Sequence, residues 1–264
     1  QCPADANAEL YSNNQCYHPQ NYDGAFRGPV TLRQALAQSL NIPSVKVLYL
    51  AGINQTINLA HDMGITTLQD RTRYGLALVL GGGEVKLLDL TAAYGVFANE
   101  GVRQPQAAIL KIETSQGEIL EEDKNKPARV LEPQITRIIS DILSDNTART
   151  PVFGSSSPLY LSGRPVAAKT GTTQEYRDAW TIGYTPSLVA GVWAGNNDNT
   201  PMRKEGAGLY AAAPIWHDFM QKAYEVKTKN SPSGQNPLSS PWEQTKEEAS
   251  NQMQKPNEFF LPNQ

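Results

Sequence analysis

The sequence predicts an α+β fold in which an antiparallel sheet is covered by helices. Three observations lead to this prediction. Residues 164–193 have the pattern of an antiparallel meander, with turn residues Pro186-Ser187 before its last strand. Residues 31–52 show leucines at helical spacing. Residues 214–226 have the amphipathic pattern of a helix that covers one face of a sheet.

Composition limits the classes of function. The 264 residues are 39% hydrophobic and 19% charged, which is typical of a globular protein with one large domain or two small ones. The formal net charge of −3 provides no general attraction to nucleic acid, so we predict no nucleic-acid partner. No apolar run approaches the roughly 20 residues that span a bilayer. Because residue 1 is Gln rather than Met, we expect a piece of a longer protein, with any anchor or export signal upstream.

The first regular elements are two helices that meet at a corner. Residues 1–29 are rich in Asn, Gln, Tyr and Pro and predict irregular structure. Residues 31–34 match a capping box and begin a helix to about Ser39. A second helix has Pro43 in its first turn and ends before Gly52. Ser39 and Asn41 therefore lie at a corner, where both can face one cleft, although both residue types also make purely local hydrogen bonds at helix ends.

The middle of the chain predicts helices and a hairpin. Residues 54–63 have the pattern of a helix. The glycines at 81–83 do not fit a phosphate-binding loop, because no Gly-Lys-Ser/Thr follows, and predict a tight turn into another helix. Residues 108–112 and 118–120 predict a hairpin. Three isoleucines share one face of a helix that Pro133 opens: Ile135, Ile138 and Ile142.

The end of the chain and its cysteines carry less information. Residues 227–264 contain few apolar side chains, so we expect a polar, disordered tail. Cys2 and Cys16 could close a small disulfide worth about 3 kcal/mol, but two cysteines do not decide the compartment or whether they pair. The three histidines lack ligand spacing, so we predict neither a metal site nor a cofactor.

The first strand of the meander carries Lys169-Thr170-Gly171-Thr172. An ammonium and a hydroxyl can hold a substrate carboxylate, and a glycine lets a ligand backbone lie against the strand edge. The backbone N–H of Thr172 can serve as an oxyanion donor. The ordinary alternative is a surface lysine on an edge strand.

Three segments, in this order, resemble the transpeptidase domain of class A penicillin-binding proteins, the bifunctional cell-wall synthases. They are GPVTLRQALAQSLNIPSVKVLYLAGI, LGGGEVKLLDLTAAYGVFANEG and AAKTGTTQEYRDAWTIGYTP. The resemblance extends from about Tyr22 to Ala223. It implies a β-lactamase/transpeptidase-like fold with a largely helical subdomain that carries Ser39, and it assigns residues 1–226 to a partial transpeptidase domain.

One departure from the family pattern concerns the nucleophile. The family signature is Ser-x-x-Lys, a Ser-Asp-Asn-type motif and Lys-Thr-Gly. The sequence contains no Ser-x-x-Lys, and Ser44-Val45-Lys46 is one residue short. We therefore expect a domain cut just after its nucleophile helix, without the early strands, and inactive as a fragment.

The resemblance implies a peptidoglycan D,D-transpeptidase that cross-links stem peptides ending in D-Ala-D-Ala through a serine acyl-enzyme, with β-lactams as inhibitors. By resemblance, Ser39 relays a proton to the leaving amine and Asn41 holds the substrate amide and orients the missing lysine. Lys169 anchors the terminal carboxylate and is a second cation beside that lysine. The implied substrate-binding residues are Thr170, Gly171 and Thr172.

The resemblance also implies a glycosyltransferase domain upstream in the same parent protein. It places the domain outside the cytoplasmic membrane, in the periplasm or on the cell-wall side, anchored by an upstream transmembrane segment. Two alternatives remain. One is a D,D-carboxypeptidase or serine β-lactamase of the same fold, against which the likeness of residues 31–52 argues. The other is a non-catalytic module that binds peptidoglycan.

Overall fold

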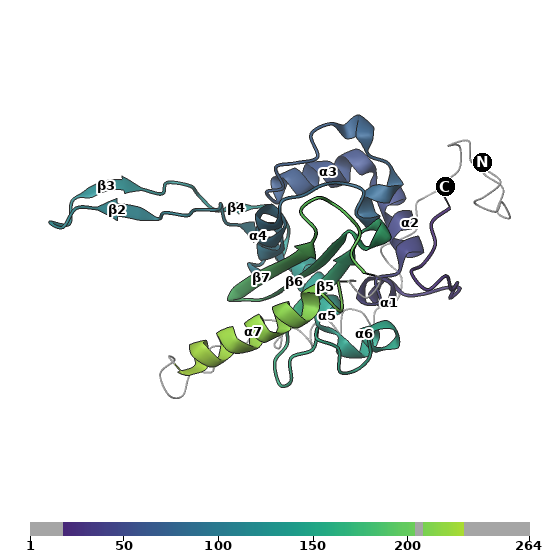
Figure 1. Ribbon diagram of the computed structural model, residues 1–264. Helices are drawn as coiled ribbons and strands as arrows, with labels where there is room; N and C mark the ends of the chain where they lie inside the picture. Colours follow the sequence, from purple (N-terminus) through teal and green to yellow (C-terminus); the bar gives the residue numbers. More distant parts are fainter. Residues whose placement is uncertain (1–17, 204–207, 230–264) are drawn as a thin grey trace.

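The structure is a computed structural model that describes residues 18–203 and 208–229. Its centre is a three-stranded antiparallel sheet with the order β5-β6-β7 (Figure 1). These strands are β5 (Ala167–Thr172), β6 (Asp178–Thr185) and β7 (Leu188–Gly195). The predicted meander is confirmed, and within the described residues β5 is an edge strand.

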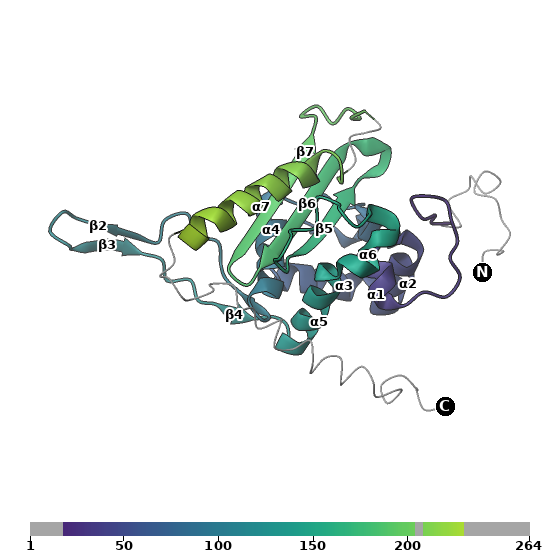
Figure 2. The ribbon, with the colours of Figure 1, turned by 90° about the horizontal axis from the view of Figure 1, so that it is seen from below.

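Helix α7 (Ala212–Lys229) covers one face of this sheet (Figure 2). It confirms the predicted amphipathic helix and continues beyond the predicted end at Val226. Trp216 of this helix is fully buried against the sheet, and its indole N–H donates to the carbonyl of Ala190 in β7 at 3.2 Å. A Cβ at Gly183 would lie 2.2 Å from the Trp216 ring, so glycine at this position lets helix and strand approach closely.

Two helices, α4 (Leu87–Ala98) and α5 (Pro133–Ser144), pack on the opposite face. Tyr184 of β6 is fully buried there, in a cluster with side chains from both helices. The ring centroids of Tyr94 and Tyr184 are 6.1 Å apart, in an edge-on arrangement favoured by aromatic pairs. The sheet is therefore the middle layer of three.

The predicted helix α5 is present and Ile142 is buried, but the row of isoleucines is not the whole buried face. Ile135 is 49% exposed, whereas Thr136 and Ser140 are fully buried. The Ser140 hydroxyl donates to the Thr136 carbonyl at 2.7 Å and lies 3.0 Å from the Tyr184 hydroxyl. Because these hydroxyls have hydrogen-bond partners, small polar residues can face the core at little cost.

The helical part of the molecule begins with α1 (Leu32–Ala37), α2 (Asn41–Ala51) and α3 (Ile53–Asp62), close to the predicted bounds. The capping box is confirmed, since the Gln34 N–H donates to the Thr31 hydroxyl at 3.2 Å and the Gln34 side chain accepts from the Thr31 N–H at 3.0 Å. The predicted corner between two helices is thus present.

Short 3-10 helices connect these parts: η1 (Arg71–Arg73), η2 (Leu76–Leu80) and η3 (Gln174–Tyr176). Gly81 ends η2 with φ of +100°, a left-handed conformation that favours glycine. The chain then turns into α4, so the predicted tight turn is confirmed.

A hairpin projects away from the body in both views (Figures 1 and 2). At its base, β1 (Val102–Arg103) pairs with β4 (Ala128–Arg129), and further out β2 (Lys111–Glu113) pairs with β3 (Ile119–Glu122). The outer hairpin was predicted, and its base strands were not. We call residues 104–127 the hairpin arm.

Helix α6 (Asn146–Phe153) was also not predicted. It contains Pro151 and two β-branched threonines, which weaken a helical pattern, although Asp145 caps it by accepting from the Ala148 N–H at 2.8 Å. Residues 18–30 are irregular as expected. Cys2, Cys16 and residues 230–264 of the predicted tail lie outside the described residues.

Candidate active site

Ser39 lies at the corner between α1 and α2 in an uncommon backbone conformation. Its φ is +57°, in the left-handed region that costs a non-glycine residue energy. The neighbouring Leu40 is only 4% exposed, and its N–H donates to the Ala35 carbonyl at 2.9 Å. Burial of Leu40 thus holds the corner in place and leaves the Ser39 side chain facing a cleft.

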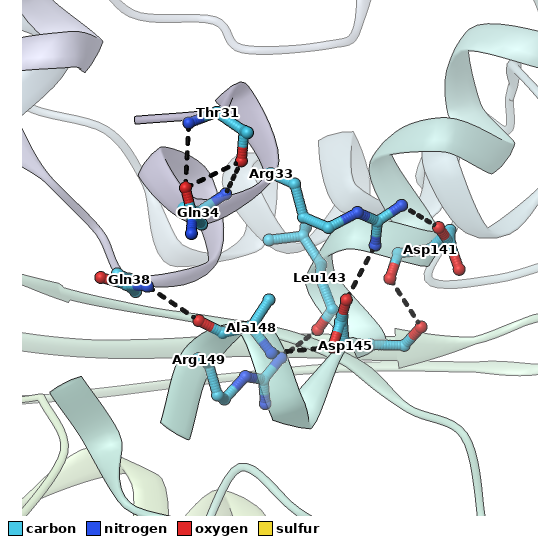
Figure 3. Close-up of polar contacts among 10 residues, drawn as sticks. Thr31, Arg33, Gln34, Gln38, Asp141, Leu143, Asp145, Ala148 and Arg149 are labelled. Carbon is cyan, nitrogen blue, oxygen red and sulfur yellow. Dashed lines mark hydrogen bonds and ion pairs between the residues drawn. The ribbon is translucent and has the colours of Figure 1, made fainter. Parts of the chain in front are cut away.

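A set of polar contacts fixes this corner to the α5–α6 region (Figure 3). Arg33 of α1 forms ion pairs with Asp141 and Asp145, the latter at 3.0 Å. At the end of the same helix, the Gln38 amide donates to the Ala148 carbonyl at 3.1 Å. These residues are more than 100 positions apart in sequence, so the corner is positioned by tertiary contacts.

Lys169 of β5 meets Ser39 across the cleft. Its Nζ donates to the Ser39 Oγ at 2.6 Å and to the Thr170 carbonyl at 2.7 Å. Burial and, to a smaller extent, repulsion from Arg149 together lower the pKa of Lys169 to about 8. The two side chains predicted from separate short motifs therefore form one hydrogen-bonded pair, with a lysine whose proton is more easily lost than usual.

Arg149 was not among the predicted site residues. It is 2% exposed, and its guanidinium donates to the carbonyls of Leu159 at 3.0 Å, Ala168 at 3.4 Å and Leu143 (Figure 3 shows the last contact). Burial lowers the pKa of Arg149 to about 10, so it stays charged at neutral pH. The residue ties β5 to two other segments and places a positive charge behind Lys169.

Asn41 lies in the same cleft but makes a different contact. Its side-chain amide donates to the Gln20 carbonyl at 2.8 Å. The neighbouring Asn21 side chain accepts from the Ile42 N–H at 3.2 Å. The segment before α1 is therefore held against the beginning of α2, and no hydrogen bond joins Asn41 to Ser39 or Lys169 among the contacts of the described residues.

The edge of β5 presents backbone groups to the cleft. The Thr173 N–H donates to the Asp178 carbonyl of β6 at 3.1 Å. Since the bonding direction alternates along an antiparallel strand, the N–H groups of Thr170 and Thr172 point to the unpaired edge. The backbone arrangement agrees with the expectation that this edge can receive a ligand.

The two threonine side chains are placed differently from Lys169. Alternation along a strand puts residues 170 and 172 on the face opposite Lys169 and Gly171. The Thr172 hydroxyl accepts from the Gly208 N–H at 3.0 Å. A Cβ at Gly208 would lie 2.4 Å from the Gly171 carbonyl oxygen, so this segment backs the strand closely. The side chains of Thr170 and Thr172 therefore lie on the sheet face opposite Lys169. These two residues contribute to the cleft chiefly through their backbone groups.

The cleft has a volume of about 1060 Å³. The Ser39 corner lines it, as do the end of η2 and the glycine turn that follows. Trp180 and Trp193, which pair across β6 and β7, line it further along the sheet. The Trp193 indole donates to Asp178 at 2.8 Å, which fixes this aromatic side chain. Both tryptophans were predicted only as strand residues, although Trp180, which pairs with Gly171, was a usable signal of a site.

Two kinds of feature are absent from residues 18–203 and 208–229. No three His, Cys, Asp or Glu side chains there gather as a metal site would require. None of the helices in the same ranges is both long and apolar enough to cross a membrane.

Comparison with known proteins gives consistent matches. The family of the penicillin binding protein transpeptidase domain matches residues 4–221. Penicillin-binding protein 1A of Aquifex aeolicus is 38% identical over 221 residues, which are 82% of this chain and 29% of that protein. Penicillin-binding protein 1A of Clostridium acetobutylicum is 33% identical, with 86% of this chain and 28% of that protein covered. The chain thus spans less than a third of the length of these relatives.

Solved structures have the same fold. PonA1 of Mycobacterium tuberculosis in complex with penicillin V has a TM-score of 0.69 at 26% identity and covers 84% of this chain and 61% of that one. Penicillin-Binding Protein 1A from Haemophilus influenzae has a TM-score of 0.68 at 25% identity, with 87% of this chain and 39% of that chain covered. The predicted α+β, β-lactamase/transpeptidase-like fold and the resemblance to class A proteins are confirmed. The chain belongs to the family of penicillin-binding protein transpeptidase domains.

Proposed function

We propose that the cleft is the substrate site of a peptidoglycan D,D-transpeptidase, which cross-links stem peptides ending in D-Ala-D-Ala through a serine acyl-enzyme. The observation that carries the proposal is the 2.6 Å contact between Lys169 Nζ and Ser39 Oγ in a cleft beside an unpaired strand edge. Such an edge can accept an extended peptide as an added strand.

Lys169 has the properties that a carboxylate anchor needs. With a pKa of about 8 it carries its charge in most molecules at neutral pH, inside a partly buried cleft. A desolvated ammonium binds a carboxylate more strongly than an exposed one does. It also lies beside the proposed position of the base lysine, whose neutral form a second cation favours.

Ser39 and the Thr172 backbone have roles in the same reaction. Ser39, hydrogen-bonded to Lys169, relays a proton to the leaving amine. The Thr172 N–H at the strand edge donates to the oxyanion of the tetrahedral intermediate. Asn41 exchanges the Gln20 carbonyl for the substrate amide when substrate binds.

Gly171 leaves the edge open for the ligand. A Cβ there would meet Trp180 at 3.4 Å, an ordinary contact distance, so packing inside the protein does not demand glycine. Glycine at this position instead leaves free space on the cleft side. A peptide backbone can therefore approach Thr170, Gly171 and Thr172 closely.

The attacking serine belongs to the parent protein outside these 264 residues, which contain no Ser-x-x-Lys. The similarity to penicillin-binding protein 1A supports a parent that carries a glycosyltransferase domain and works outside the cytoplasmic membrane from a membrane anchor. The complex of PonA1 with penicillin V supports β-lactams as inhibitors of this site.

The proposal is tested by labelling the parent protein with a fluorescent penicillin and mapping the labelled serine. We expect a covalent label that survives denaturation and lies outside residues 1–264, and no label on the 264-residue chain alone. A label on Ser39 would contradict the assignment of the nucleophile. Absence of any label on the parent would favour a non-catalytic binding module.

Lysine variants of the parent test the anchor. Lys169→Ala should slow penicillin acylation by at least about 30-fold, because loss of one partner of a buried charge pair costs roughly 2–5 kcal/mol. Lys46→Ala, which removes an exposed lysine of α2, is the matched control and should leave the rate unchanged. Equal rates for both variants would exclude the anchor role. With a stem-peptide substrate and an amine acceptor, cross-linked rather than hydrolysed product distinguishes a transpeptidase from a carboxypeptidase.

A further inference from the structure

The hairpin arm exposes apolar side chains far from the cleft. It stands free of the body in both views (Figures 1 and 2). A two-stranded hairpin is marginally stable in water, and a third strand or a packed face is normally required. Five apolar side chains on the arm are 37–70% exposed: Ile109, Leu110, Ile112, Ile119 and Leu120. The arm therefore has the properties of a surface that another strand covers.

The two edges of the arm differ in regularity. Ile112 pairs with Glu121, but the next residue, Glu113, pairs with Ile119, so Leu120 is an extra residue in β3. A bulge of this kind disrupts the edge that carries it and discourages further pairing. Strand β2 contains no extra residue, so its outer edge is the one suited to another strand.

The backbone groups on the outer edge of β2 can be assigned. The Leu110 carbonyl accepts from the Asp123 N–H at 2.8 Å, and the Thr114 N–H donates to the Glu118 carbonyl at 2.8 Å. Residues 110, 112 and 114 therefore direct their backbone groups toward β3. By alternation, the N–H and C=O groups of Lys111 and Glu113 point outward, where no strand of the described residues pairs with them.

We propose that the outer edge of β2 pairs antiparallel with β2 of a second copy of this chain, about a two-fold axis at Ile112. In this register the backbone groups of Lys111 bond those of Glu113 in the second copy, and the reverse pair is identical by symmetry. Lys111 and Glu113 form an ion pair within the single chain, and in the dimer each Lys111 ammonium also lies opposite the Glu113 carboxylate of the second copy. The two Ile112 side chains meet in a close, non-hydrogen-bonded pair. The result is a four-stranded sheet.

Charge favours Ile112 over Lys111 and Glu113 as the position of the axis on β2, and it disfavours two of the axes on β3. A two-fold axis at Lys111 would oppose two lysines, and an axis at Glu113 would oppose two glutamates, both of which are unfavourable. On β3, an axis at Glu121 opposes two glutamates, and an axis at Leu120 places Glu118 opposite Glu122. The Ile112 axis on β2 avoids like charges and gives two complementary pairs.

Charge reversal tests the pairing. The self-association constant of the 264-residue chain is measured by analytical ultracentrifugation. Lys111→Glu and Glu113→Lys should each weaken the dimer by about tenfold or more, because like charges then face each other. The double variant should restore it, since its charges are complementary again. Lys126→Glu makes the same charge change on the arm away from β2 and should have no effect.

Cross-linking tests the register. In a Cys2→Ser and Cys16→Ser background, Ile112→Cys should form a symmetric disulfide dimer on mild oxidation, because Cα atoms of such a pair are about 4.5 Å apart, within disulfide reach. Ile119→Cys on β3 should not. A chain that stays monomeric up to millimolar concentration, a dimer indifferent to charge reversal, or cross-linking through Ile119 instead of Ile112 would each overturn the proposal.

Discussion

The molecule contains two antiparallel β structures with opposite surroundings. In the three-stranded sheet, helices cover both faces and Ile182 is 2% exposed, whereas in the hairpin arm Ile112 is 37% exposed. Glycine shows the same contrast. A Cβ at Gly183 would collide with Trp216, but one at Gly117 would meet nothing within 4 Å. Glycine thus admits a covering helix in the sheet and supplies only a turn in the arm, where φ is +86°.

The largest expected effect comes from replacing an isoleucine by alanine in the sheet, compared with the same replacement in the arm. Ile182→Ala should lower the free energy of unfolding by about 2–5 kcal/mol, because it leaves a cavity between covered layers. Ile112→Ala should cost less than about 1 kcal/mol in the monomer, since water already reaches this side chain. Urea unfolding of the two variants measures both values. Similar losses would show that the arm contributes to the core.

A smaller effect is expected from Arg149, which supports the sheet from behind. Arg149→Met should lower the free energy of unfolding by about 1–3 kcal/mol, because buried carbonyls lose their donor. It should also raise the pKa of Lys169, because the repulsion from the guanidinium is lost while the burial remains. Arg149→Lys keeps the charge and should leave the pKa of Lys169 close to that of the unchanged protein.

The pH profile of penicillin acylation in the parent protein measures this shift. As pH rises through about 8, Lys169 loses its proton and the carboxylate site loses its charge, so the rate should fall. In Arg149→Met this fall should move to higher pH. Stability changes in the opposite sense, since the unfolded chain holds the Lys169 proton up to the usual lysine range and folding therefore becomes more favourable as pH rises above about 8. Identical profiles for both Arg149 variants would refute a contribution of its charge.

The smallest effect should follow removal of the arm. Replacing residues 108–126 by a short Gly-Ser turn should change the free energy of unfolding of the monomer by less than about 0.5 kcal/mol, as for other exposed segments. Hydrogen exchange of β5 and β6 amides, compared with the intact chain, checks whether the sheet is unaffected. Faster exchange throughout the sheet would mean that the two structures are coupled.

Local signals predicted much of the fold. The capping box at Thr31, the proline at 133 and the turn at Pro186-Ser187 each involve neighbouring residues, and each has the predicted result. On α5, apolar spacing indicated the buried Ile142 but not Thr136 and Ser140, whose hydroxyls find partners within the helix and at Tyr184.

The site was predicted only in part. Ser39 and Lys169 came from motifs, and the structure joins them, while their catalytic roles remain our proposal. Arg149 gave no signal, because its partners are backbone carbonyls that any sequence would offer. The Thr172 hydroxyl contact with Gly208 likewise depends on a close backbone approach that only the folded chain reveals.

The distance along the chain between Ser39 and Lys169 has a consequence for biosynthesis. These residues are 130 positions apart, and the contacts that brace the corner, from Arg33 and Gln38, span 108 to 112 positions. Contacts of such long range are slow to form, because a large loop must close before they bring any gain. During synthesis α1 and α2 leave the ribosome long before β5 does. The corner between α1 and α2 therefore cannot make its contact with β5 until that strand has been synthesised, and the cleft forms late in folding.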